Sequence, residues 1–232
     1  MRKAESSSRL FTGTEITQAS GTSSPGADEP ILKRLRAGDE EAFRELVRSH
    51  HASMIRFART LVKNLETAEE VVQETWLAAL QGLGRFEGRS SLKSWIFGIL
   101  ANRARTRGVR DGRMISFSEL PGDRDYEAPA VDPSRFDHAG SWREPPLRWD
   151  EPGPERLALS AELRHHLADA MDALPEQQRA VFLIRDVEGM SSQDACNVLG
   201  LSETNQRVLL HRARSRMRNA LEMKLGVRRG KT

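Results

Sequence analysis

Residues 174–221 constrain the fold most strongly, because their sequence predicts three helices separated by short breaks. Pro175 suits the first position of a helix, where a missing amide hydrogen costs nothing. Ser191 is a favourable N-cap for a second helix, and Gly200 suits the left-handed residue that ends it. Ser202 then caps a third helix. A break of about three residues between the last two helices is typical of a helix-turn-helix.

The third of these helices carries a continuous cationic stripe. Arg207, His211, Arg214 and Arg218 recur at i, i+4, i+7 and i+11, so they share one face. Another face is apolar and is expected to dock on the preceding helices; it contains Leu210, Ala213, Met217 and Leu221. A basic helix presented by such a turn is typical of recognition in a DNA groove. The alternative is a solvated basic face on an ordinary helical hairpin.

Positive charge is concentrated in two separate segments of a chain whose formal net charge is only +3. Residues 92–113 hold six Lys or Arg against one Asp, and residues 206–231 hold nine against one Glu. Two basic patches on a nearly neutral chain indicate two contacts with one polyanion.

The sequence argues against several other classes of protein. The single cysteine, Cys196, excludes an internal disulfide and a Cys-rich zinc site, and its place inside a predicted helix favours a buried core residue. No apolar run is long enough to span a membrane, and no apolar stretch follows Arg2 and Lys3 to form a secretory signal. We therefore expect a soluble cytoplasmic protein without direct membrane insertion.

Neither an enzyme site nor a cofactor site can be assembled from the residues. No nucleophile is paired with a base in a recognisable setting, and there is no phosphate-binding glycine loop. The adjacent histidines at 50–51 and 165–166 point to different helix faces and have no companion ligands at metal-binding spacing. We expect no catalysis, no metal, no cofactor and no small-molecule substrate.

The composition divides the chain into five segments. Residues 1–27, rich in Ser, Thr and Gly, are predicted to be a disordered extension. Helical periodicity predicts one small domain over 28–113 and a second over 159–222, which contains the helix-turn-helix. Residues 114–158 hold seven of the ten prolines and are predicted to be a flexible linker, and 223–232 form a basic tail. Because no strand pattern is long enough to trust, the predicted fold class is all-α.

Capping signals place the helices of the first domain. Gly38 ends a first short helix, and Asp39 caps a second. Thr67 with Glu70 three residues later resembles a capping box for a helix over 68–80.

The helix predicted over 68–80 has two contrasting faces. One face is expected to be mostly core and consists of Val71, Val72, Thr75, Trp76, Ala79 and Leu80. The opposite face is acidic with one exposed leucine and consists of Glu70, Gln73, Glu74 and Leu77. Such a surface suits a basic protein partner; the alternative is a plain solvated face.

A helix predicted over 92–109 carries the first basic patch. Its buried stripe is expected to contain Trp95, Ile96, Ile99 and Leu100. A different stripe, in which the missing side chain of glycine lets a flat group approach, contains Gly98, Asn102, Arg105 and Val109. Asparagine can pair with a base edge, and arginine can neutralise phosphate or stack on a base.

The loop at 86–94 leads into this helix, and Ser90 or Ser91 is expected to cap it. The loop is rich in small residues, backbone amides and hydroxyls. A loop of this kind can cradle an unstacked base through stacking and polar contacts.

Three strings together resemble a bacterial RNA polymerase sigma factor of the extracytoplasmic-function (ECF) group of the sigma-70 family. They lie at 68–80, 84–107 and 174–221, and the resemblance covers roughly 29–113 and 159–221. It implies an alternative-type sigma factor that binds core RNA polymerase, directs it to specific promoters and promotes DNA melting. Core polymerase, promoter DNA and an anti-sigma factor, commonly membrane-bound, are the implied partners.

The resemblance also implies roles for individual residues. The polymerase-binding residues would be Glu70, Gln73, Glu74 and Leu77. The residues that bind the minus-ten element would be Arg89, Ser90, Ser91, Lys93, Asn102, Arg103, Arg105, Arg107 and Arg110. Those that bind the minus-thirty-five element would be Ser202, Thr204, Asn205, Arg207, His211, Arg212 and Arg214. The chain departs from the usual family pattern at Gln206, Val208 and Leu209, which bears on the base contacts of the recognition helix.

Two other functions remain open from the residues alone. A helix-turn-helix transcription regulator that acts without polymerase would explain the C-terminal helices but not the basic helix and its loop. A helical adaptor would use its arginine stripes to bind acidic proteins.

Overall fold

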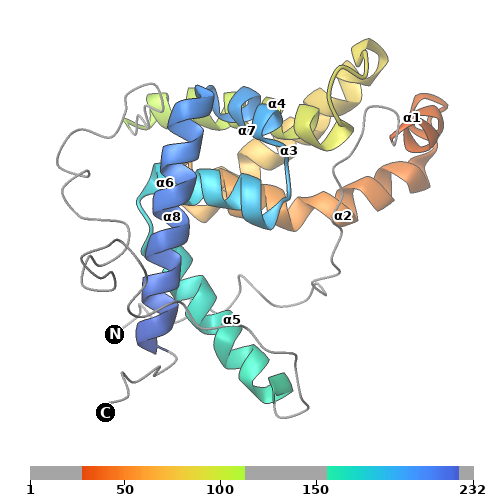
Figure 1. The fold of residues 1–232 in the computed structure, drawn as a ribbon. Coiled ribbons are helices and arrows are strands. Elements are labelled where there is room, and N and C mark those ends of the chain that lie inside the picture. Colours follow the sequence, from red (N-terminus) through yellow and green to blue (C-terminus); the bar gives the residue numbers. More distant parts are fainter. Residues whose placement is uncertain (1–27, 113–155, 225–232) are drawn as a thin grey trace, which may run out of the picture. The chain divides into compact units, whose positions relative to one another are not determined.

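The computed structural model describes residues 28–112 and 156–224 (Figure 1). Within these residues every regular element is helical, which confirms the predicted all-α class. In chain order the elements are α1 (Glu29–Arg36), α2 (Glu40–Ala58), α3 (Leu65–Gly82), η1 (Leu83–Arg85), α4 (Leu92–Arg110), α5 (Arg156–Asp172), α6 (Glu176–Phe182), η4 (Leu183–Val187), α7 (Ser192–Leu199) and α8 (Glu203–Lys224). The predicted extension at 1–27, and almost all of the predicted linker and tail, lie outside the described residues.

The described helices form two compact units. One unit contains α1 to α4, α6, η4, α7 and α8 as far as Leu210. The other contains α5 and α8 from His211 onward. The first unit therefore holds both the basic helix α4 and the turn of the helix-turn-helix. None of the helices in the described ranges is both long enough and apolar enough to cross a bilayer.

The boundary between α1 and α2 follows the predicted signals. Gly38 has a φ of 79°, a left-handed conformation that favours glycine. The side chain of Asp39 accepts hydrogen bonds from the amides of Glu41 and Ala42 at 2.9 and 3.1 Å. This cap satisfies two amides that a helix start otherwise leaves without partners, and it confirms the role predicted for Asp39.

The start of α3 differs from the prediction. The N-cap is Asn64, whose side-chain oxygen accepts the amide of Thr67 at 2.8 Å. Thr67 is buried inside the first turn, so the capping box predicted from Thr67 and Glu70 is wrong. Asparagine is as good an N-cap as threonine, and the earlier start adds a turn to the helix. At the other end, Leu80 is exposed, so the predicted core face of this helix ends at Ala79.

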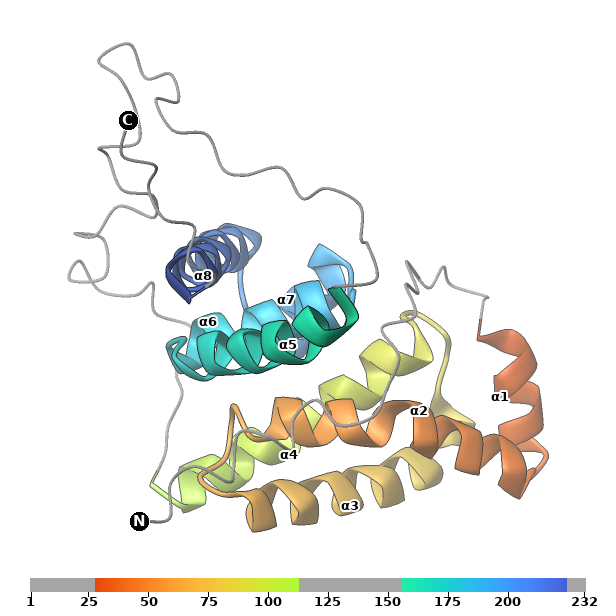
Figure 2. The ribbon, with the colours of Figure 1, turned by 90° about the horizontal axis from the view of Figure 1, so that it is seen from below.

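Helices α2, α3 and α4 pack against one another around a shared core, and Figure 2 shows them as neighbouring layers. Phe57 of α2 and Phe97 of α4 are fully buried, and their ring centroids lie 5.7 Å apart. Burying side chains of this size stabilises a fold by about 1.5–3 kcal/mol each. The same core continues through Val198 and Leu199 of α7, so α4 has the helix-turn-helix as a further neighbour.

The helix-turn-helix is built from the predicted caps. The Ser191 hydroxyl accepts the amide of Asp194 at 3.0 Å and starts α7. Gly200 ends α7 with a φ of 66°, and the Ser202 hydroxyl accepts the amide of Asn205 at 3.2 Å to start α8. A turn of three residues separates the two helices, as predicted.

Two features near α6 were not predicted. The helix begins at Glu176, so Pro175 lies just before it rather than in its first position. It continues into a π-helical segment, η4, after which Gly189 turns the chain with a φ of 67°. A guanidinium nitrogen of Arg185 donates to the carbonyl of Met190 across this turn.

The second unit joins α5 to the end of α8. Lys224 donates to the carboxylate of Asp169 at 2.5 Å, and this bond lowers the pKa of Asp169 below its ordinary value. α5 begins at Arg156, slightly before the predicted return of helical structure at 159.

Candidate nucleic-acid and polymerase interface

The outer face of α3 carries the residues predicted to bind a basic protein partner. Glu70, Gln73, Glu74 and Leu77 are all exposed, and Leu77 has an exposed fraction of 61%. The four side chains are therefore accessible to a protein partner, as the prediction requires. The spacing places all four on one side of α3, away from the buried stripe.

Two ion pairs connect this acidic face to α4. Glu74 accepts from Arg103 at 2.9 Å, and Glu70 accepts from Arg107 at 2.6 Å. The residues predicted to contact polymerase are therefore bonded to residues predicted to contact the minus-ten DNA. Sequence analysis missed this connection because the partners lie 29 and 37 positions apart. All four side chains are partly exposed, so each pair stabilises the fold by only about 0.2–1 kcal/mol.

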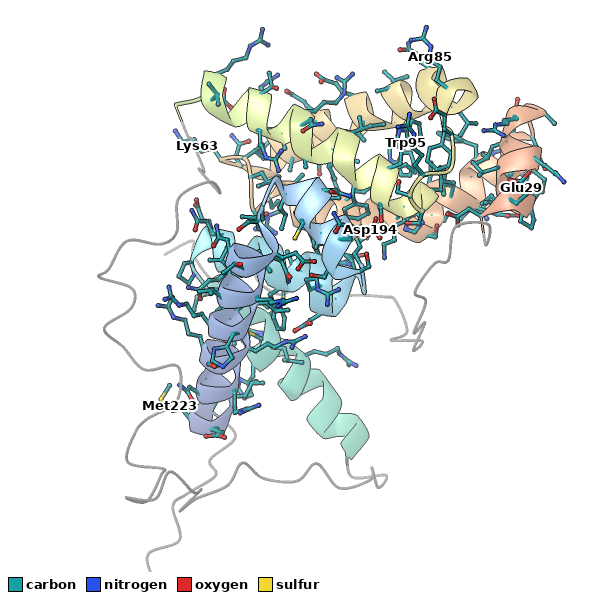
Figure 3. The ribbon with its side chains drawn as sticks, turned by 45° about the horizontal axis from the view of Figure 1, so that its top comes forward. Glu29, Lys63, Arg85, Trp95, Asp194 and Met223 are labelled. Carbon is teal, nitrogen blue, oxygen red and sulfur yellow. The ribbon has the colours of Figure 1, made fainter. Side chains whose placement is uncertain are left out.

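The loop before α4 is anchored by an aromatic pair. The rings of Phe86 and Trp95 lie 5.0 Å apart, and Figure 3 shows Trp95 on the side of α4 toward this loop. A Cβ at Gly82 would lie 3.1 Å from the Trp95 ring, so glycine permits this close packing. Arg36 of α1 donates to the Phe86 carbonyl at 2.6 Å. Trp95 of α4 and Arg36 of α1 therefore hold Phe86 at the start of the loop.

Among the predicted minus-ten residues that precede α4, two are accessible and one is not. Arg89 is exposed and forms an ion pair with Glu87, and Ser90 is half-buried. Ser91 is only 7% exposed; its hydroxyl accepts the Ser94 amide at 3.1 Å and donates to the Ser94 hydroxyl at 2.8 Å. Because these bonds cap α4, Ser91 positions the helix rather than presenting its hydroxyl to a base.

The predicted strand-binding stripe of α4 is polar and partly accessible. Asn102 and Val109 are exposed, and a Cβ at Gly98 would have no atom within 4 Å. Arg105 is half-buried: it donates to the Asn102 side chain at 3.2 Å and to the Val198 carbonyl of α7 at 2.7 Å. Burial lowers the pKa of Arg105 from its ordinary value, but a guanidinium keeps its proton at neutral pH.

Other basic residues of α4 differ in their surroundings. Lys93 is half-buried and forms an ion pair with Glu188 at 2.9 Å. Arg110 is exposed near the end of the helix. The helix therefore carries an exposed cation at Arg110 and a cation already paired with a carboxylate at Lys93.

The cationic stripe of α8 has the predicted exposure. The four residues of the stripe, Arg207, His211, Arg214 and Arg218, are all exposed. The four apolar residues of the docking face, Leu210, Ala213, Met217 and Leu221, are all buried. Thr204 and Ser202 are exposed beside the start of the helix, and Arg212 is half-buried.

The start of α8 turns two polar side chains inward. Asn205 is 4% exposed, which argues against a direct base contact by this residue. Gln206 is 1% exposed, and its side-chain oxygen accepts the hydroxyl of Ser192 at 2.9 Å. The unusual glutamine thus ties α8 to the start of α7. Sequence analysis singled out Gln206 but did not predict this bond.

Two family models match the chain. The model described as "Sigma-70 region 2" matches residues 46–113, and the model described as "Sigma-70, region 4" matches residues 164–217. The first match covers most of α2 to α4, and the second covers the helix-turn-helix and its flanking helices.

Several individual proteins are also similar. A "Probable RNA polymerase sigma factor" from Haemophilus influenzae is 31% identical over 172 residues, which is 74% of this chain and 86% of that protein. An "ECF RNA polymerase sigma-E factor" from Escherichia coli K12 is 26% identical over 84% of this chain and 94% of that protein. A solved structure titled "Structure of CnrH in complex with the cytosolic domain of CnrY" is 21% identical, with a TM-score of 0.49, and covers 85% of this chain and 98% of that chain.

Proposed function

Because the chain belongs to the sigma-70 family of RNA polymerase sigma factors, in its ECF group, we propose that α3, α4 and α8 divide the work of promoter recognition between them. Sigma factors bind core RNA polymerase and are not themselves enzymes. The observation that carries the assignment of DNA binding is the exposed cationic stripe of α8. This helix begins after a three-residue turn, and its apolar residues are buried on a different face from the stripe.

The minus-thirty-five element is assigned to α8. The proposed contacts to bases and phosphates in the major groove come from Ser202, Thr204, Arg207, His211, Arg212 and Arg214. Asn205 belongs to the same group by position, but its burial makes it a positioning residue, like Gln206.

The minus-ten element is assigned to α4 and its preceding loop. The exposed amide of Asn102 would pair with an unstacked base beside the open space at Gly98. The proposed contacts to phosphates of the melted strand come from Arg89, Ser90, Lys93, Arg103, Arg105, Arg107 and Arg110, with Ser91 positioning the helix. Capturing an unpaired base offsets part of the unstacking cost, which is on the order of a few kcal/mol.

Polymerase binding is assigned to Glu70, Gln73, Glu74 and Leu77 of α3. Leu77 would contact an apolar part of the partner surface, and the carboxylates of Glu70 and Glu74 would contact basic residues around it. Each DNA-binding part alone would bind weakly, and attachment of both to one polymerase raises their effective concentration at a promoter. In this scheme residues 28–113 and 159–222 are the two functional domains, joined by a linker over 114–158.

Further proposals follow from membership of the group. The protein would act in the cytoplasm, where polymerase and promoters are found. An anti-sigma factor is a further proposed partner. The rival function, a regulator that acts without polymerase, gains no support from the apolar and acidic face of α3.

The decisive experiment combines the full chain with core RNA polymerase. We expect co-elution in size-exclusion chromatography and run-off transcription from a discrete set of sites on genomic DNA. A protein that binds duplex DNA but neither co-elutes nor supports transcription would be a regulator, and the proposal would be wrong.

A further inference from the structure

Helix α1 bonds to both ends of the loop segment 86–91, which connects η1 to α4. Arg36, the last residue of α1, donates to the Phe86 carbonyl at 2.6 Å, where the segment begins. Asp28, the residue just before α1, accepts the Leu92 amide at 2.6 Å, where α4 begins. The partners lie 50 and 64 positions apart in the sequence, so neither bond belongs to a local turn.

Asp28 makes this bond instead of the one that its position favours. It occupies the N-cap of α1, where aspartate is common because its side chain can accept amides of its own helix. The Asp28 carboxylate makes no such bond to α1. The Leu92 amide is the first of α4 and has no partner inside that helix, and a carboxylate beside it interacts favourably with the positive end of the helix dipole. The residue before α1 therefore caps a different helix.

The bond from Asp28 adds to the local cap of α4. The Ser91 hydroxyl accepts the Ser94 amide at 3.1 Å, whereas Asp28 accepts the amide of Leu92. The start of α4 thus has one amide bonded to its own N-cap and another bonded to the residue before α1. Because a substitution at Asp28 leaves the Ser91 cap in place, α4 would still form without the remote bond.

Helix α1 is itself attached to the core of its compact unit. Leu32 and Leu35 are buried in the core shared with α2, α3 and α4, and Ile31 packs against it. A helix of eight residues is about 12 Å long and keeps its ends at a fixed separation. The chain from Phe86 to Leu92 could span up to about 20 Å if nothing held it. Two bonds to one rigid element therefore restrict how far apart the ends of the loop segment can move.

The middle of the loop segment is left accessible. Glu87 and Arg89 are exposed, and Gly88 and Ser90 are half-buried. Gly88 turns the chain with a φ of 72°, a left-handed conformation that favours glycine. Fixed ends and an accessible centre suit a loop that receives a ligand without first having to become ordered.

We propose that α1 is a brace for this loop, in which Asp28 and Arg36 are positioning residues for capture of the minus-ten base. The proposal rests on the function proposed above, because it uses the assignment of the loop to the minus-ten element. Neither residue needs to touch DNA, since each acts through the backbone group that it holds. A loop that is already ordered loses less conformational entropy when a base binds, so the brace strengthens capture. It also sharpens selection, because a loop with fixed ends cannot reshape itself around a different base.

The test uses two pairs of matched variants. Asp28→Ala is compared with Asp39→Ala, because both remove a carboxylate that accepts backbone amides at a helix start, but Asp39 holds α2. Arg36→Met is compared with Arg34→Met, because both remove a cation from α1, but Arg34 pairs with carboxylates away from the loop. Methionine keeps the apolar part of the arginine side chain.

The first measurement is hydrogen–deuterium exchange in the full chain without DNA. We expect exchange at the amides of residues 87–92 to rise about tenfold in Asp28→Ala and in Arg36→Met, because each variant frees one end of the loop. Asp39→Ala should instead raise exchange at the start of α2, and Arg34→Met should leave the loop unchanged. Wild-type exchange of the loop in both Asp28→Ala and Arg36→Met would overturn the brace.

The second measurement is the preference of the holoenzyme, assembled from core polymerase and each variant, for one DNA single strand over another. The probes are the labelled non-template strand of a minus-ten element, taken from a promoter found by run-off transcription, and a strand of the same composition in scrambled order. Because a lost charge weakens binding of both strands alike, the ratio of their Kd values reports selection. We expect this ratio to fall about tenfold, or about 1.4 kcal/mol, when Asp28→Ala and Arg36→Met are combined, and less than about twofold in Asp39→Ala and Arg34→Met.

Two results of the second measurement would overturn the proposal. An unchanged ratio despite faster exchange would mean that order in the loop does not serve base capture. Equal falls in Asp28→Ala and Asp39→Ala would mean that a general loss of stability is the cause.

Asp28→Asn provides a conservative rescue. Asparagine keeps an oxygen that can accept the Leu92 amide, so this variant should retain most of the preference that Asp28→Ala loses. A preference as low as that of Asp28→Ala would contradict a role through this bond. If the wild-type holoenzyme shows no preference between the strands, the proposed function of the loop is wrong and the brace has no base to position; failure in the variants alone leaves that function intact.

Discussion

Charge reversal at Glu74 distinguishes a loss of folding stability from a loss of the polymerase binding that we propose for α3. In Glu74→Arg, the ion pair with Arg103 at 2.9 Å is replaced by two like charges. The lost pair costs about 0.2–1 kcal/mol because both side chains are partly exposed, and the repulsion adds a similar amount. The expected loss of folding stability is therefore about 0.4–2 kcal/mol, which leaves a domain of ordinary stability folded.

The effect on polymerase binding is expected to be much larger. Reversing a charge at the centre of an interface with a basic partner costs about 2–5 kcal/mol, which corresponds to a loss of affinity of about 30-fold or more. The assay is a titration of core polymerase with fluorescently labelled protein, alongside circular dichroism to confirm helix content. The matched control is Glu45→Arg, which breaks an ion pair with Arg34 at 3.0 Å on α2 and α1. If the Kd of Glu74→Arg lies within about threefold of that of Glu45→Arg, the assignment of α3 to polymerase is refuted.

Three further predictions test the DNA-binding helices and the interior. Asn102→Ala should impair promoter opening, measured by permanganate reactivity, more than it impairs duplex binding; equal loss in both assays would contradict its role. Replacing Arg207 and Arg214 by alanine should reduce the slope of log affinity against log salt for duplex DNA by about 1.8, whereas an unchanged slope would mean that neither contacts phosphate. Burial, reinforced by the charge of Lys93, lowers the pKa of His50 below its ordinary 6.5, so His50 stays neutral in the folded state while the unfolded chain binds a proton. Stability should therefore fall as pH drops below about 6.5, and the dependence of the urea midpoint on pH should be weaker in His50→Gln.

Local signals in the sequence predicted local structure well. Asp39, Gly200 and Ser202 each end or start a helix as predicted, because a cap involves residues within three positions of one another. The one wrong cap, at Thr67, arose because Asn64 offers the same chemistry three residues earlier. Helical spacing also predicted the exposed stripe and the buried face of α8.

Contacts between distant residues could not be predicted from spacing. The bond between Lys93 and the Glu188 carbonyl spans 95 positions, and no local rule relates two such residues. The same reason explains why the sequence placed Arg103 and Arg105 together as DNA-binding residues, although the structure gives one a partner on α3 and the other a partner on α7. Inward rotation of Asn205 likewise depends on tertiary packing at the start of α8.

The ion pairs between α3 and α4 have a genetic consequence. Because Glu74 bonds to Arg103 and Glu70 to Arg107, a substitution on α4 that is selected for altered promoter preference also changes the neighbours of the carboxylates that we propose to face polymerase. Suppressors of such alleles should therefore arise in the partner enzyme as well as in the promoter. Recombining the N-terminal half of this chain with α4 from a relative would separate Glu70 and Glu74 from their arginine partners, so chimeras should be joined outside α3 and α4.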